Sequence, residues 1–178
     1  MNNDIESVLY DQKQLDERMD EIAAKLNKQY QDKNPIVVSV LTGAMIFTSD
    51  LVKRLNFKLN LDLIKASSYA GAQSTGDVKI EYDLKYDLKG RDVIIMEDIM
   101  DTGYTLEYLK KLFIKRGAKS VKIVCMLDKP ETRQVDLTPD EYCFKAPDAF
   151  LVGYGLDYNG CYRNLPYVGI LKKEVYAN

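Results

Sequence analysis

Three carboxylates lie close together in the middle of the chain, in the segment EDIMDTGYT (97–105). Hydroxyl groups and a flexible glycine at the start of a helix can direct several donors at one phosphate. Acids beside such a site repel phosphate unless they bind a metal ion, sugar hydroxyls or a proton in transfer. The alternative is a helix cap, in which acids favour the helix dipole. A cap would account for Asp101 but leaves Glu97 and Asp98 without a role.

The same segment lacks the fingerprints of common nucleotide sites, because it matches neither GxxxxGK[ST] nor GxGxxG. The chain has no histidine, so proton transfer near neutral pH must use a carboxylate, Lys, Tyr or Cys. Ser-His-Asp triads, papain-like Cys-His pairs and histidine-based zinc sites are therefore excluded. Cys125, Cys143 and Cys161 have no CxxC spacing, and we expect structural thiols in a reducing cytoplasm.

The composition is that of a globular protein, with 178 residues, 46% hydrophobic and 29% charged. The net charge of -2 and the pI near 5.3 do not predict a broad nucleic-acid surface. No apolar run approaches the roughly 18 residues of a membrane span, and the first residues lack the order of a signal peptide. We expect one cytoplasmic domain over residues 1–178.

Alternating strands and helices must position the acidic segment. Continuous apolar, β-branched runs predict buried strands at 35–41, 92–96 and 120–127. Apolar residues at helical spacing predict helices at 12–31, 44–55 and 105–117. Two more strands are expected, at 58–64, with Leu59, Leu61 and Leu63 on one face, and around 78–82. This order indicates an α/β fold with an open, mainly parallel twisted sheet flanked by helices. Such sheets bind ligands beyond the carboxyl ends of their strands, where the expected turn at 97–105 lies.

The segment VIIMEDIMDTGYT (93–105) resembles the phosphoribosyl-pyrophosphate motif of the type I phosphoribosyltransferases. Its two acids, two apolar residues and Asp-Thr-Gly resemble the hypoxanthine-guanine branch, whereas the adenine and orotate branches usually differ at Asp101. Further segments follow in the family's order and spacing: LTGAMIF (41–47), SSYAGAQSTGDV (67–78), LDKPETR (127–133) and FLVGYGLDYNGCYRNLPYVG (150–169). The resemblance covers roughly residues 35–176. It implies the type I phosphoribosyltransferase fold, with a small hood formed by terminal segments.

The resemblance implies purine salvage. The 5-phosphoribosyl group of phosphoribosyl pyrophosphate would pass to hypoxanthine or guanine, giving IMP or GMP and pyrophosphate. In this family Glu97 and Asp98 would face the ribose hydroxyls and one Mg²⁺ ion, and Asp101 would be the catalytic residue that handles the N7 proton. The loop that holds the 5′-phosphate would comprise Asp101, Thr102, Gly103, Tyr104 and Thr105.

The resemblance also implies how the purine base is bound. Lys129 would donate to the exocyclic O6, since an ammonium has three donors and no acceptor and so disfavours the amino group of adenine. Arg133 would support this contact. Phe150 would stack on the ring, and the carbonyl of Leu151 would read its edge.

The leaving pyrophosphate would meet three further groups. Asp157 would bind a second Mg²⁺, Arg163 would contact the pyrophosphate, and the backbone of Thr42 and Gly43 would grip it, often with unusual peptide geometry. Many relatives carry a basic residue where this chain has Thr42, so a charge contact is absent here. Gly160 also replaces a common acidic residue.

The small, polar residues at about 67–77 predict a mobile loop. By resemblance, Ser68 and Tyr69 would close over the pyrophosphate and keep water from an oxocarbenium-like centre.

Several alternatives remain open on sequence grounds. The protein could be a member of the family that prefers xanthine. It could also be a regulator that has this fold and binds RNA, although the acidic pI disfavours the basic face that RNA binding needs. A purely structural module would leave the acids at 97–101 without a purpose. A homodimer or homotetramer is expected, because relatives form both.

Overall fold

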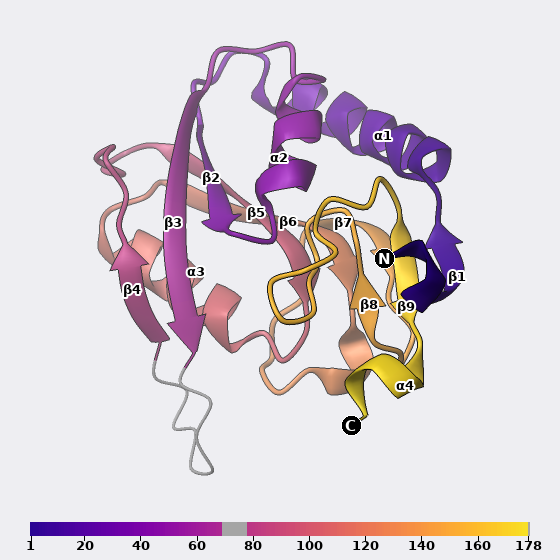
Figure 1. Ribbon diagram of the computed structural model, residues 1–178. Coiled ribbons are helices and arrows are strands. Elements are labelled where there is room, and N and C mark those ends of the chain that lie inside the picture. The colour runs from indigo at the N-terminus through magenta and orange to yellow at the C-terminus, as the bar shows by residue number, and fades with distance from the viewer. Residues whose placement is uncertain (69–77, 178) are drawn as a thin grey trace.

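A computed structural model describes residues 1–68 and 78–177 and shows a six-stranded sheet between helices (Figure 1). The strand order is β4-β3-β2-β5-β6-β7, and every neighbouring pair is parallel except β3 with β4. The strands are β2 (Ile36–Leu41), β3 (Asn60–Ser68), β4 (Val78–Tyr82), β5 (Asp92–Met100), β6 (Ser120–Asp128) and β7 (Glu141–Lys145). The predicted open, mainly parallel α/β sheet is confirmed.

Helices cover both faces of this sheet because its central strands are apolar on both sides. Alternate strand residues point to opposite faces, so Val37 packs in the cluster that contains α1 (Gln12–Tyr30) and α2 (Met45–Val52). Val38 packs in the cluster with α3 (Tyr104–Lys115) on the other face. The start of α1 is fixed by a capping box between Asp11 and Gln14.

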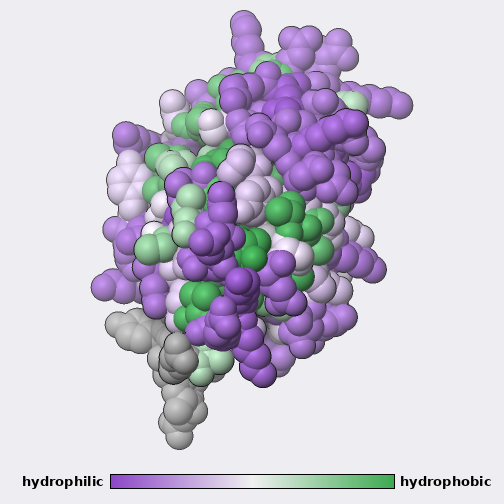
Figure 2. All heavy atoms as spheres, turned by 45° about the vertical axis from the view of Figure 1, so that its right-hand side comes forward, coloured by the Kyte–Doolittle hydropathy of each residue, from purple (hydrophilic) through white to green (hydrophobic). Residues whose placement is uncertain are grey.

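The predicted hood is a second, antiparallel sheet of order β1-β9-β8 that joins distant parts of the chain. Its strands are β1 (Ile5–Tyr10), β8 (Leu151–Val152) and β9 (Val168–Leu171), and α4 (Lys173–Tyr176) follows. Two short 3₁₀ turns, η1 (Asn2–Asp4) and η2 (Pro130–Thr132), complete the elements. Figure 2 brings the hood side forward and shows a largely hydrophilic surface, with hydrophobic side chains gathered near its middle.

Several element boundaries differ from the sequence prediction, and two of these differences lie near the predicted site. β5 continues through Met100, so residues 97–100 are strand rather than turn. The expected loop at 67–77 also starts later, because Ser67 and Ser68 pair with Lys79 and Val78 within β3 and β4. In both places polar residues stay in the strand because neighbouring strands bind their main-chain groups.

The alternating leucines of β3 lie on its more exposed face, with Leu61 46% and Leu63 37% exposed. Asp62 and Ile64 are buried instead, and the Asp62 carboxylate accepts main-chain N–H groups from Lys85 and Tyr86. The exposed leucines therefore form an apolar strip on one face of β3. In the residues described by the structure, no helix is both long and apolar enough to cross a membrane.

Candidate active site

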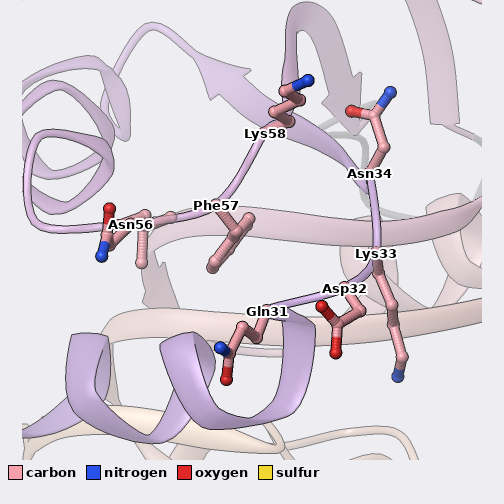
Figure 3. A pocket seen from close by; sticks show the side chains of 8 residues that line it. Gln31, Asp32, Lys33, Asn34, Asn56, Phe57 and Lys58 are labelled. Atoms are coloured by element: carbon pink, nitrogen blue, oxygen red, sulfur yellow. The ribbon is translucent and has the colours of Figure 1, made fainter.

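One cavity lies at the opposite end of the sheet from the predicted site. It measures about 610 Å³ and opens between the end of α1 and the segment before β3, near the amino ends of β2 and β3 (Figure 3). Its lining is mostly exposed, with Lys33 and Lys58 as cations and Asp32 as the acid. It holds none of the predicted site residues.

Two smaller cavities lie where the sequence predicts a site, beyond the carboxyl ends of the strands. One measures about 440 Å³ and is lined by residues that include Gly43, Glu97, Thr102, Gly103, Thr105 and Arg163. The other, of about 340 Å³, is lined by residues that include Lys129, Phe150 and Leu151. Asp98, Ile99, Asp101 and Asp157 line both. The cavities therefore adjoin, and most of the predicted site residues are brought together around them.

Glu97, which is buried, and Asp98, which is half-buried, are adjacent acids near the end of β5. Burial, with the adjacent Asp98 carboxylate, raises the pKa of Glu97 well above its usual range. Burial also raises the pKa of Asp98, despite the positive charge of Arg163. A Cβ atom on Gly43 would lie 1.6 Å from an oxygen of Asp98, so a larger residue here would force the Asp98 carboxylate to turn away from the loop before α2. The peptide bond between Leu41 and Thr42 in that loop is cis.

The predicted phosphate loop, residues 101–105, follows β5 directly and runs into the start of α3. Gly103 has a φ of 89° and is the residue before the helix, which has no side-chain cap. Asp101 is therefore not the cap, and that alternative interpretation is wrong. Its carboxylate instead accepts a hydrogen bond from the hydroxyl of Thr132. Thr102 and Thr105 line the larger cavity, whereas Tyr104 does not.

Arg133 lies behind the phosphate loop and lines neither cavity. Its guanidinium donates to the carbonyl oxygens of Met100 (3.0 Å) and Asp101 (2.9 Å) and pairs with Asp128. A Cβ atom on Gly103 would lie 2.9 Å from Cδ of Arg133. Arg133 thus holds the backbone of the loop in place and does not face the cavity of Lys129.

The smaller cavity has the character of a base site. Lys129 follows β6 and is 15% exposed, and its Nζ atom lies 3.5 Å from the carboxylate of Asp148. Phe150 stacks on Tyr176 of α4, with ring centroids 4.8 Å apart and planes at 27°. The rings of Tyr158 and Phe150 pack edge to face, with centroids 5.4 Å apart. Because Phe150 lines the cavity and Tyr176 does not, α4 supports Phe150 from outside the cavity.

Asp157 and Arg163 form an ion pair of 2.7 Å at the larger cavity. The second oxygen of Asp157 accepts the N–H of Gly160 at 2.8 Å. Gly160 has a φ of 77°, which favours glycine and gives a structural reason for its departure from the family pattern. Thr42 is exposed and does not line the cavity, although Gly43 does.

The predicted cover of the site, residues 67–77, lies mostly outside the residues that the structure describes. Tyr69 and residues 70–77 lie outside them, and Ser68 is the last residue of β3. Cys125 and Cys143 are buried, as expected of structural thiols, whereas Cys161 is exposed; all three are free.

Comparison with known proteins identifies this arrangement. Residues 7–159 match the phosphoribosyl transferase domain. The chain belongs to the phosphoribosyltransferase family. The resemblance predicted from the sequence is confirmed, as is the fold.

Two relatives of this phosphoribosyltransferase are similar along their whole length. The hypoxanthine-guanine phosphoribosyltransferase of Bacillus subtilis is 48% identical, covering 100% of this chain and 99% of the relative. That of Streptococcus pneumoniae is 46% identical with the same coverage. A crystal structure of a hypoxanthine phosphoribosyltransferase from Staphylococcus aureus is 44% identical, with a TM-score of 0.97 over 100% of this chain and 97% of that one.

Proposed function

We propose that this phosphoribosyltransferase transfers the 5-phosphoribosyl group from phosphoribosyl pyrophosphate to hypoxanthine or guanine. The products are IMP or GMP and pyrophosphate, so the reaction is a step of purine salvage. The observation that carries the proposal is the pair of adjoining cavities that share Asp98, Asp101 and Asp157. One cavity has the groups for a phosphorylated sugar, and the other has those for a flat base with a carbonyl group.

The donor occupies the larger cavity. Its 5′-phosphate binds at the start of α3, where main-chain N–H groups and the hydroxyls of Thr102 and Thr105 converge at the positive end of the helix dipole. The pyrophosphate lies between Gly43 and Arg163, whose charge offsets the negative charge of the leaving group. We further propose that residues 67–77 cover this end of the site, with Ser68 and Tyr69 over the pyrophosphate.

Mg²⁺ fits the acids of this cavity. In the described part of the chain no three His, Cys, Asp or Glu side chains gather into a metal cluster, but Mg²⁺ commonly uses one or two carboxylates together with substrate phosphates. Glu97 and Asp98 would hold one ion, and the charge of a cation would offset the burial that raises their pKa values. Asp157 would hold a second ion beside Arg163. The metal supplies charge neutralisation for pyrophosphate.

The base binds in the smaller cavity, with its ring against Phe150 and its O6 at Lys129. Asp101 lines both cavities. It takes the N7 proton while the base bonds to the anomeric carbon and the bond from that carbon to pyrophosphate breaks. The Thr132 hydroxyl orients its carboxylate. Xanthine shares the 6-oxo group, and the main-chain carbonyls near Leu151 decide whether it is also accepted.

The cellular form of the enzyme is a further proposal. We propose a homodimer or homotetramer, because Leu61 and Leu63 leave an apolar strip exposed on β3. We also propose a cytoplasmic location, in which Cys125, Cys143 and Cys161 stay reduced.

The test is the stoichiometry of the reaction. Wild-type protein is incubated with phosphoribosyl pyrophosphate, Mg²⁺ and hypoxanthine, and IMP, pyrophosphate and ribose 5-phosphate are quantified. We expect one pyrophosphate for each IMP and little ribose 5-phosphate. Release of ribose 5-phosphate without IMP would indicate a hydrolase, and RNA retention on filters without IMP formation would favour the RNA-binding regulator.

A further inference from the structure

A buried tyrosine links the hood to the helix that follows the Gly43 loop. Tyr154 is 4% exposed and lies in the turn after β8. Its hydroxyl donates to the carboxylate of Asp50 on α2 across 2.6 Å, between residues 104 positions apart in the sequence. The segment between β8 and β9 extends toward α2 in Figure 1. Neither side chain lines either site cavity.

The loop between β8 and β9 carries both Tyr154 and Arg163, the arginine that we propose contacts pyrophosphate. The N–H of Tyr154 donates to the carbonyl of Leu165 (2.9 Å), and the N–H of Gly155 donates to the carbonyl of Arg163 (3.0 Å). The Arg163 guanidinium donates in return to the carbonyl of Gly155 at 2.6 Å and pairs with Asp157. These reciprocal bonds make Tyr154, Gly155 and Arg163 one unit.

This unit packs directly on the second pyrophosphate loop. A Cβ atom on Gly155 would lie 2.1 Å from the carbonyl oxygen of Gly43, so the two loops touch through their backbones. α2 begins at Met45, two residues after Gly43, and Asp50 lies one and a half turns further along it. The Asp50–Tyr154 bond therefore ties the turn to the same rigid element that carries the Gly43 loop.

The protonation states make this a strong bond between a neutral hydroxyl and a carboxylate. Although burial opposes it, hydrogen bonds from Lys53 and Tyr154 lower the pKa of Asp50, so its carboxylate stays ionised. Burial and the Asp50 hydrogen bond raise the pKa of Tyr154, so its hydroxyl keeps the proton that it donates. Charge-assisted bonds of this kind are about twice as strong as neutral ones.

We propose that Asp50 and Tyr154 are a positioning pair that sets the distance between the Gly43 loop and Arg163, and so the affinity of the site for pyrophosphate. The inference rests on the proposed function, because it assigns the pyrophosphate end of the donor to these two loops. The pair acts through Gly155 and does not touch the substrate. Neither Asp50 nor Tyr154 lines the cavity of Lys129 and Phe150, so we expect base binding to depend less on the pair than pyrophosphate binding does.

The test compares Tyr154→Phe, which removes only the hydroxyl, with Tyr167→Phe as a matched control. Tyr167 donates its hydroxyl to Asn2 in the hood (3.1 Å), away from both cavities, whereas the Tyr154 hydroxyl also lies 3.7 Å from Sδ of Met19. Binding of inorganic pyrophosphate with Mg²⁺ is measured by calorimetry, and Michaelis constants are measured for both substrates. We expect Tyr154→Phe to weaken pyrophosphate binding and raise the donor Michaelis constant about tenfold, a typical effect of losing a bond to a charged group. The hypoxanthine Michaelis constant should stay within about twofold, and Tyr167→Phe should change none of the three.

A second variant keeps the proposal testable if the first one folds poorly. Asp50→Asn retains the size of the side chain but loses its charge, and it should produce the same pyrophosphate defect. The double variant should bind pyrophosphate no more weakly than the weaker-binding single variant, since both substitutions break the Asp50–Tyr154 bond. Asp50→Asn also removes the ion pair with Lys53, which lies away from the contact between the two loops and is lost in both the single Asp50→Asn variant and the double variant. Unchanged pyrophosphate affinity in both single variants, additive losses, or an equal loss of hypoxanthine binding would overturn the pair. Wild-type protein that binds no pyrophosphate would instead refute the proposed function, and the pair with it.

Discussion

Replacing Asp101 by Asn separates the chemical role of this residue from its structural one. The carboxylate lines both cavities, is exposed, and accepts the Thr132 hydroxyl. Asn keeps the size of the side chain and an oxygen that can accept the same hydroxyl, but it cannot take a proton. Because Gly103 and not Asp101 precedes α3, the substitution removes no side-chain cap.

The substitution should change turnover and folding stability by very different amounts. A general base contributes about 10²–10⁴-fold, so we expect turnover to fall by that factor, which is about 3–5 kcal/mol of barrier. The cost to folding is small, since an exposed acid near a helix N-terminus contributes about 0.3–1 kcal/mol. Binding of the donor should be unchanged or slightly tighter, because a negative charge beside its phosphate is removed.

The assay measures turnover, donor affinity and melting temperature on the same purified variant. Asp136→Asn is the control, because Asp136 is an exposed acid on the loop after η2 and lines neither cavity. It should behave as wild type. Near-wild-type turnover in Asp101→Asn, with donor binding intact, would refute the assignment of proton transfer to Asp101.

Four further predictions follow from the same geometry. Lys129→Ala should raise the Michaelis constant for hypoxanthine at least tenfold while donor affinity stays near wild type; an unchanged constant would remove Lys129 from base recognition. Activity should disappear after chelation of Mg²⁺, and Asp157→Asn should shift the Mg²⁺ titration to higher concentrations, whereas an identical titration would exclude it as a ligand. Burial and the neighbouring acid raise the pKa of Glu97, so the unfolded chain loses this proton first and stability falls as pH rises above about 4.5. In the absence of Mg²⁺, Glu97→Gln should therefore unfold at a higher denaturant concentration than wild type at pH 8, and unfolding at a lower concentration would contradict the argument that a buried charge at Glu97 destabilises the fold. Finally, Tyr176→Ala should weaken hypoxanthine binding about three- to tenfold by removing the support of Phe150, whereas Tyr176→Phe should not; equal effects would show that stacking is irrelevant.

The sequence predicted the central sheet well because its signals are local. Continuous apolar runs at β2, β5 and β6 and helical spacing in α1 and α3 depend on neighbouring residues alone. The hood strands were anticipated only through the family resemblance, because β8 has two residues and β9 four, too few for periodicity. The continuation of β5 to Met100 was missed, since polar residues there are held by pairing with β6.

The site was predicted by motif, and the residues that support it were not. Thr132, Tyr154 and Asp50 act through contacts between segments distant in sequence, and no local pattern marks such contacts. Gly43 was predicted through the family resemblance, whereas Gly155 was not, and the close approach of these two backbones is seen only in the structure.

The most direct test of the central claim is the activity of wild-type protein with four purines. Hypoxanthine, guanine, xanthine and adenine are each supplied with phosphoribosyl pyrophosphate and Mg²⁺, and kcat/KM is measured from nucleotide formation. We predict efficient use of hypoxanthine and guanine and a kcat/KM for adenine that is at least about a hundredfold lower, because Lys129 offers only donors at the 6-position. Equal use of adenine, or no nucleotide formed from any of the four bases, would contradict it.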